Sequence, residues 1–97
     1  MPTAFRLEQN YPIPFNPTTV VSYRLPAVSD VRLVVYDILG RGVAVLVNER
    51  RNAGIHEARF DASGLCSGVY FCRLQARQID GGQAGYFTQT EKMLLAR

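Results

Sequence analysis

The strongest constraint on this fold is a two-residue alternation of apolar and polar side chains that glycine and proline interrupt repeatedly. No stretch longer than about ten residues keeps the 3.6-residue period of a helix free of glycine or proline. Segments rich in β-branched and aromatic residues are instead separated by short turn-like stretches. The sequence therefore predicts strands almost throughout and no long helix.

The alternation places strands at 18–25, 30–38, 42–49, 55–61, 69–77 and 86–95. The strongest is DVRLVVYDI, Asp30 to Ile38, which has apolar side chains on both faces and so indicates a central strand between two layers. Strands of this length, separated by turns and preceded by an extended leader, are typical of an all-β fold. We expect a small antiparallel immunoglobulin-like β-sandwich of about six to seven strands.

Length and composition indicate one ordinary globular domain. The chain has 97 residues, of which 47% are hydrophobic and 20% charged, and its formal net charge is +3. Its basic residues are scattered, whereas a nucleic-acid-binding protein is expected to cluster them, so we expect no nucleic-acid partner. We assign residues 1–6 to a residual linker and residues 7–97 to a single domain, with a proline-rich leader at 7–17 and a terminal strand at 86–97.

The sequence offers little for catalysis or metal binding. His56 is the only histidine, and it is the only base available to the two cysteines, Cys66 and Cys72. One histidine and two cysteines at this spacing match no familiar zinc pattern. We expect no catalytic residues, no metal, no cofactor and no small-molecule substrate. We also expect free thiols, with an intermolecular link through Cys66 left open.

The leader LEQNYPIPFNPTT has three prolines within six positions. Proline fixes its own φ and favours extended backbone in the residue before it. An extended leader would project Tyr11, Ile13 and Phe15 to one side. We expect Tyr11 and Phe15 to dock on the sandwich, each contributing about 2 kcal/mol, while the missing N–H groups keep the leader from pairing as an edge. The predicted docking residues are Tyr11, Pro12, Pro14, Phe15, Asn16 and Pro17.

Four segments in order carry a family resemblance: LEQNYPIPFNPTT, VRLVVYDILGRGVAVLV, FDASGLCSGVYFCRL and EKMLLAR. Together they resemble the carboxy-terminal sorting domain of type IX (Por) secretion cargo proteins, over about residues 6–97. Part of the pattern also resembles the immunoglobulin-like module of the flagellar hook-cap protein. The family usually has asparagine where this chain has Ile13, and different residues at Cys66 and Cys72.

The resemblance implies a non-catalytic domain at the end of a larger secreted protein. It implies a covalently attached N-terminal cargo domain, recognition by outer-membrane components of the type IX machinery, and a sortase-like protease that removes the tail. The destination would be the cell surface or the medium, by way of the periplasm and outer membrane. By position, Gly68 and Tyr70 match the family's glycine–tyrosine element, and Pro12, Pro14, Asn16 and Pro17 match its leading proline element.

The chain's last residues match the family's terminal signal: Lys92, Met93, Leu94, Leu95, Ala96 and Arg97. At a sheet edge this strand would present unpaired backbone groups and its side chains to a partner, and recognition by strand addition would then be geometrically available. We expect deletion of these residues to abolish export without unfolding the domain. Two alternatives remain, a carbohydrate- or cell-surface-binding module and a structural assembly module of the hook-cap kind. Weak homodimerisation of the excised domain is also left open.

Overall fold

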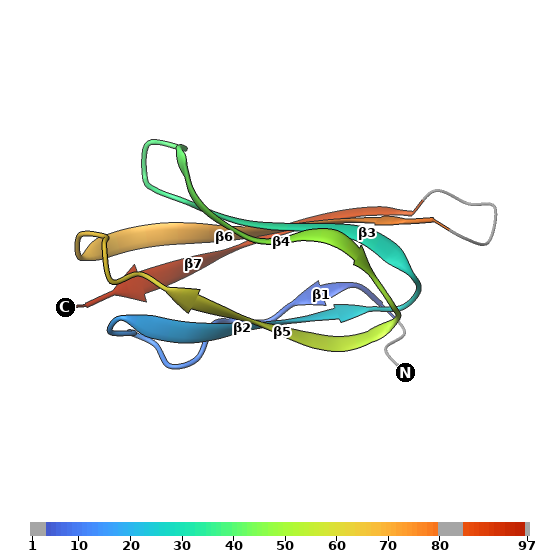
Figure 1. The fold of residues 1–97 in the computed structure, drawn as a ribbon, viewed down its shortest axis with the longest axis horizontal. Coiled ribbons are helices and arrows are strands. Elements are labelled where there is room, and N and C mark those ends of the chain that lie inside the picture. The colour runs from blue at the N-terminus through green and yellow to red at the C-terminus, as the bar shows by residue number, and fades with distance from the viewer. Residues whose placement is uncertain (1–3, 80–84, 97) are drawn as a thin grey trace.

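The computed structural model describes residues 4–79 and 85–96, so Arg97 of the predicted signal lies outside the described residues. The described residues form an all-β structure of two antiparallel sheets (Figure 1). The seven described strands are β1 (Arg6–Leu7), β2 (Thr18–Leu25), β3 (Ser29–Tyr36), β4 (Gly42–Arg51), β5 (Gly54–Asp61), β6 (Gly68–Gln78) and β7 (Tyr86–Leu95). The predicted antiparallel sandwich is confirmed.

The strand order is β1-β2-β5 in the smaller sheet and β4-β3-β6-β7 in the larger one. The two sheets face each other along the long axis of the molecule (Figure 1). The first residue of the described chain and the end of β7 lie at opposite ends of that axis. No helix long and apolar enough to cross a membrane occurs in the part of the chain that the structure describes.

The core lies between the sheets and is built from alternate residues of each strand. Its buried members come chiefly from β2, β3, β6 and β7: Val21, Tyr23, Leu25, Val31, Leu33, Val35, Tyr70, Cys72, Leu74, Met93 and Leu95. The strand β3 is interior within its sheet, but the expectation that it lies between two layers is wrong. Only its inner face meets the second sheet, because the sandwich has two layers. On its outer face the Arg73 guanidinium lies 4.8 Å from the centre of the Tyr36 ring.

Several boundaries differ from the prediction by one or two residues, and two of the differences have a clear physical cause. The strand β3 ends at Tyr36, before Ile38, because the Asp37 carboxylate accepts the backbone N–H groups of Leu39 (2.9 Å) and Arg41 (3.0 Å) and turns the chain. This is the local side-chain bonding by which aspartate initiates turns. At the other end, Arg6 lies in β1 and the Phe5 ring stacks on Phe87, so the folded body includes these two residues of the predicted linker.

Candidate recognition site at the leader and the C-terminal strand

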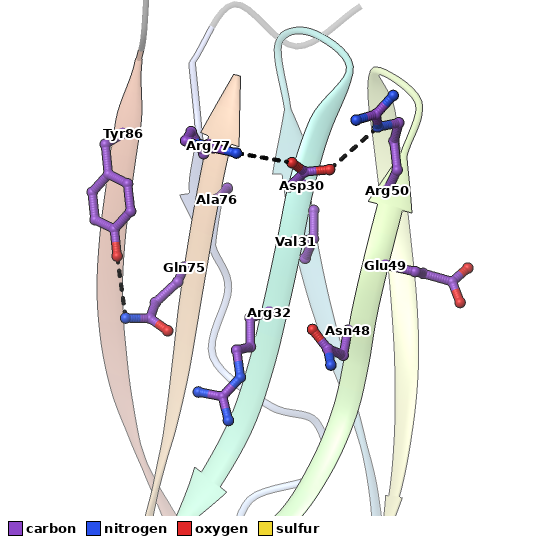
Figure 2. A pocket seen from close by; sticks show the side chains of 10 residues that line it. All are labelled: Asp30, Val31, Arg32, Asn48, Glu49, Arg50, Gln75, Ala76, Arg77 and Tyr86. Atoms are coloured by element: carbon purple, nitrogen blue, oxygen red, sulfur yellow. Dashed lines mark hydrogen bonds and ion pairs between the residues drawn. The ribbon is translucent and has the colours of Figure 1, made fainter. Parts of the chain in front are cut away.

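A hollow of about 520 Å³ lies on the outer face of the larger sheet (Figure 2). At one end of the hollow, the Asp30 carboxylate accepts hydrogen bonds from the side chains of Arg50 (3.2 Å) and Arg77 (3.4 Å). The hydrogen bond from Arg50 lowers the pKa of the Asp30 carboxyl, and Arg77 lowers it further. Partial desolvation acts in the opposite direction but is the smaller effect. A carboxylate held ionised between two arginines is poorly suited to accept a proton. Within residues 4–79 and 85–96 no three potential metal ligands gather.

The single histidine has structural partners. The Nε2 atom of His56 lies 2.7 Å from the carbonyl oxygen of Asn52, and its ring stacks on Tyr23 with 5.3 Å between centres. Cys72 is buried in β6, where burial raises the pKa of its thiol to about 12, while Cys66 is exposed in the turn before β6. A thiol so strongly held in its protonated form is a poor nucleophile.

The last strand divides the predicted terminal signal between two faces. Met93 and Leu95 point into the sandwich and are buried, whereas Lys92, Leu94 and Ala96 point outward. Leu94 is 44% exposed, so its side chain is open to contact with a partner. Because successive side chains of a strand point to opposite faces, the same short segment contributes two side chains to the core and others to the surface.

The glycine–tyrosine element lies directly beside this segment. In the pairing of β6 with β7, Gly68 lies opposite Leu95 and Tyr70 opposite Met93. The Tyr70 hydroxyl donates a 2.6 Å hydrogen bond to the carbonyl oxygen of Cys66. A tyrosine at the start of this strand that bonds the backbone a few residues upstream is the tyrosine corner of immunoglobulin-like sandwiches. Gly68 has a φ of 147°, a conformation that side-chain-bearing residues rarely adopt.

The leader covers the free edge of β7 at its C-terminal end. The Phe15 N–H donates to the Leu94 carbonyl (3.0 Å), and the Ala96 N–H donates to the Phe15 carbonyl (3.0 Å). The Phe15 ring is 1% exposed and lies 5.9 Å from the Phe60 ring in the core. The expectation that this end of the strand presents unpaired backbone groups is therefore wrong, because the leader already occupies its edge.

The aromatic residues of the leader do not share one docked side. Tyr11 is 70% exposed and Ile13 is 53% exposed, so the expected docking of the Tyr11 ring is wrong. Tyr11 is held by its backbone instead, through reciprocal 3.0 Å hydrogen bonds with Val20. The leader thus pairs at its non-proline positions, contrary to the expectation that prolines keep it from pairing. Of its other predicted docking residues, Pro12, Pro14 and Asn16 are exposed and Pro17 is half-buried. In the leader, the peptide bonds Tyr11–Pro12, Ile13–Pro14 and Asn16–Pro17 are cis.

Asn10 is a site residue that the sequence analysis missed. Its side chain is buried, and its Nδ2 atom donates to the Pro12 carbonyl (3.1 Å) and to the Thr19 hydroxyl (3.0 Å). The Thr19 hydroxyl in turn donates to the Pro12 carbonyl (3.2 Å). Asparagine commonly bonds the backbone two residues on, so an asparagine before a proline-rich turn was a usable signal.

Comparison with known protein families gives a match over most of this chain. The secretion system C-terminal sorting domain family matches residues 9–81, which run from the leader through β6 and include Gly68 and Tyr70. The chain belongs to this family. Neither a curated protein nor a solved structure matches it. The matched segment ends before β7, so the role of residues 92–97 as the terminal signal stays a prediction.

Membership defines the broad role of this sorting domain. A type IX sorting domain is attached to a cargo protein and interacts with the secretion machinery. The protein that carries this sorting domain is exported across the outer membrane to the cell surface or the medium.

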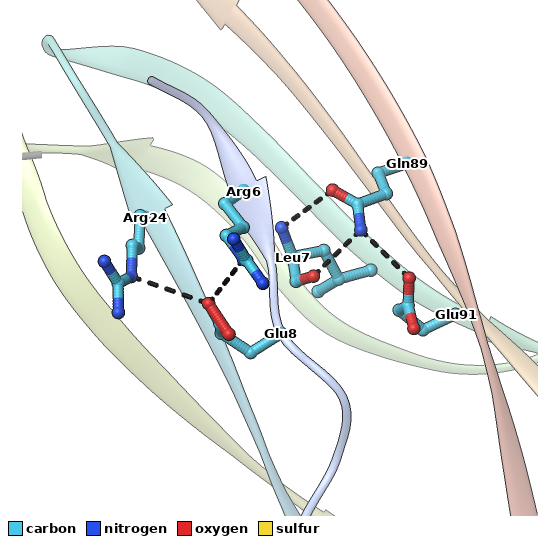
Figure 3. A network of polar contacts seen from close by, with 6 residues as sticks. All are labelled: Arg6, Leu7, Glu8, Arg24, Gln89 and Glu91. Carbon is cyan, nitrogen blue, oxygen red and sulfur yellow. Dashed lines mark hydrogen bonds and ion pairs between the residues drawn. The ribbon is translucent and has the colours of Figure 1, made fainter. Parts of the chain in front are cut away.

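A second contact joins the start of the sorting domain to β7. The Gln89 side chain accepts the Leu7 N–H at its Oε1 atom (3.0 Å) and donates from Nε2 to the Leu7 carbonyl (2.9 Å) and to Glu91 (2.9 Å) (Figure 3). The side-chain amide of Gln89 thus bonds both backbone groups of Leu7, as a paired backbone would, and links β1 of the smaller sheet to β7 of the larger one. Further along, the Gln9 side chain donates to the Lys92 carbonyl (2.8 Å).

The opposite side of β1 is held by charge. The Glu8 carboxylate lies 2.7 Å from Arg6 and 3.6 Å from Arg24 of the neighbouring strand β2 (Figure 3). Exposed ion pairs of this kind contribute little to stability, on the order of 0–1 kcal/mol each. The leader of the sorting domain is therefore positioned mainly by Phe15, Asn10 and its bonds to β7.

Proposed function

We propose that this chain is a non-catalytic C-terminal sorting domain whose signal is a folded surface made jointly by β7 and the leader. Outer-membrane components of the type IX machinery recognise it, and a sortase-like protease separates it from its N-terminal cargo. The observation that supports the proposal is the pair of backbone hydrogen bonds between Phe15 and the end of β7. Through them the leader fixes the end of the segment that carries the exposed side chains Lys92, Leu94 and Ala96.

A surface held in this way favours recognition. Strand β7 pairs with β6 along one edge. On its other edge, the C-terminal end of β7 is hydrogen-bonded to the leader. Side chains that are ordered before binding lose less conformational entropy when a partner engages them. A signal built from both ends of the domain also reports that folding is complete, because residues near its start and residues near its end must meet.

The experiment is export of a reporter to which residues 1–97 are fused, in a bacterium that has type IX machinery. The signal variant carries Lys92→Glu with Leu94→Ser, two exposed positions of β7. The matched control carries Arg59→Glu with Ile55→Ser, two exposed positions of β5 in the other sheet. We expect wild type and control to reach the surface and the signal variant to remain in the periplasm. Equal export of the two variants would contradict the role of β7.

Deletion of residues 92–97 is a poorer test than the sequence suggested. It removes Met93 and Leu95, both buried in the core, together with the Phe15 pairing. Loss of a buried side chain of this size costs about 2–5 kcal/mol. The deletion is therefore expected to destabilise the domain, and loss of export would not separate recognition from folding.

A further inference from the structure

One face of the described domain has an excess of positive charge. The outer face of the larger sheet, called here the arginine face, is formed by the outward residues of β3, β4, β6 and β7. Its charged members are Arg32, Arg50, Arg73, Arg77, Lys92 and Asp30. The remaining charged residues among 4–79 and 85–96 are five cations and six carboxylates. The net positive charge of the described chain is thus carried by this face alone.

Two of its arginines lack a carboxylate partner among the described residues. Arg32 lies opposite Asn48 on one side and Gln75 on the other, within the hollow that Figure 2 shows. Arg73 lies over the Tyr36 ring, 4.8 Å from its centre. By contrast, Arg50 and Arg77 both form ion pairs with Asp30. Of the four arginines on this face, Arg32 and Arg73 therefore have the most charge free for an external anion.

The opposite face of the sandwich has a different charge pattern. On the outer side of the smaller sheet, Arg24 and Arg59 alternate with Glu57 and Asp61 along paired strands. Arg24 is further neutralised by Glu8 at 3.6 Å. The two faces are alike in strand geometry and differ in charge, so the asymmetry does not follow from the sandwich fold itself.

The residue types on the arginine face favour a protein partner. Four of its five cations are arginine, and they lie among Tyr36, Phe71 and Tyr86. Arginine and tyrosine are enriched at protein–protein interfaces and dominate their binding energy, whereas lysine and glutamate are depleted. The face also runs without a break into the candidate signal, because Phe71 lies opposite Lys92 of β7.

We propose that the arginine face is a docking surface for an acidic surface of a protein component of the secretion machinery. This rests on the proposed function and deepens it, since it names the side of the domain that meets the partner and the charge of that partner. Arg32 and Arg73 bind carboxylates of the partner, because guanidinium groups pair with carboxylates in a bidentate geometry. Complementary charge speeds the encounter as well as holding the complex.

The test in cells uses the same reporter fusion with charge reversal on each face. Arg32→Glu with Arg73→Glu changes the arginine face and leaves β7 intact, and Arg24→Glu with Arg59→Glu is the matched control on the smaller sheet. Thermal unfolding of the purified domains verifies that each variant folds. We expect export to fall on the order of tenfold for the first pair and to stay near wild type for the control. Equal export of both pairs alongside wild type overturns the docking surface while the sorting function stands.

The test in solution does not depend on export. Poly-L-glutamate is titrated into the wild-type domain and both pairs of variants at low ionic strength, with polygalacturonate at equal charge as the second probe. We expect poly-L-glutamate to bind wild type and control with similar affinity, and the Arg32→Glu, Arg73→Glu domain on the order of tenfold more weakly. Binding of polygalacturonate as tightly as poly-L-glutamate, or more tightly, overturns the protein partner in favour of an acidic glycan. If the wild-type fusion is not exported, the sorting function fails, and this titration still decides whether the arginine face binds an acidic polypeptide.

Discussion

The hydroxyl of Tyr70 donates a 2.6 Å hydrogen bond to the carbonyl oxygen of Cys66, which ties the start of β6 to the turn that precedes it. Between them lies Gly68, whose φ of 147° lets the chain enter β6 opposite the end of β7. Gly68 and Tyr70 therefore have a structural role in this chain, because they fix the entry into β6, the strand with which β7 pairs.

Removing that hydroxyl should weaken the domain. Tyr70→Phe keeps the ring in the core and leaves the Cys66 carbonyl without its donor, so we expect the free energy of unfolding to fall by about 1 kcal/mol. Urea denaturation measures the change. Tyr11→Phe is the control, because Tyr11 is 70% exposed, and its effect should be close to zero. Equal losses in the two variants would show that the Tyr70 bond contributes nothing.

The two aromatic rings of the leader should differ sharply in their contribution. Phe15→Ala leaves a cavity beside Phe60, and we expect the free energy of unfolding to fall by about 3–5 kcal/mol. Tyr11→Ala removes an exposed ring and should cost less than about 1 kcal/mol. Both values are measured by urea denaturation of the purified domain. A large loss for Tyr11→Ala would mean that its ring docks after all.

The buried amide of Asn10 should matter more than the exposed amide of Asn16. Asn10→Ala removes the donor shared by the Pro12 carbonyl and the Thr19 hydroxyl, so we expect a loss of about 1–3 kcal/mol. Asn16→Ala changes an exposed side chain of the same leader and is expected to stay within about 0.5 kcal/mol of wild type. Thermal unfolding of both variants tests the difference, and matched melting temperatures would contradict it.

The buried thiol predicts an alkaline limit to stability. Burial raises the pKa of Cys72 to about 12 in the folded chain, whereas an unfolded cysteine ionises near a pKa of about 8.5. The folded state therefore keeps a proton that the unfolded state loses, and stability should fall as pH rises from about 8.5 toward 12, by at most about 1.4 kcal/mol per pH unit.

The measurement compares the free energy of unfolding across this pH range in Cys66→Ser and in Cys66→Ser with Cys72→Ala. The second protein lacks the thiol, so its stability should fall less steeply. Parallel pH profiles would contradict the raised pKa. At neutral pH an alkylating reagent should modify Cys66 in native wild type and reach Cys72 only after unfolding.

Most of the fold could be predicted because strand formation follows local alternation. The inward positions of Cys72 and Leu74 are set by the two-residue period together with the polar residues between them. The end of β3 was not predicted correctly. The Asp37 carboxylate accepts backbone hydrogen bonds from the residues that follow it and so turns the chain, whereas the apolar residue Ile38 made the strand pattern look longer.

The candidate site was harder to predict. Prolines identify the leader as a distinct segment, but they do not determine which of its rings finds space in the core. Phe15 is buried because the end of β7 and Phe60 form a site for it, and both come from sequence positions far from the leader. Asn10 and Gln89 were missed for the same reason, since their partners are assembled only when the sheets meet.

The sequence by itself determined the strand segments, the turns between most of them and the family to which the domain is similar, because these depend on neighbours a few residues apart. Only the tertiary structure decided that the leader covers the end of β7 and that scattered arginines become one face. Strand pairing brings Arg32, Arg73 and Lys92 onto the same side of one sheet through the register of β3, β6 and β7. Register between distant strands is set by the packing of the whole core, which no short segment encodes.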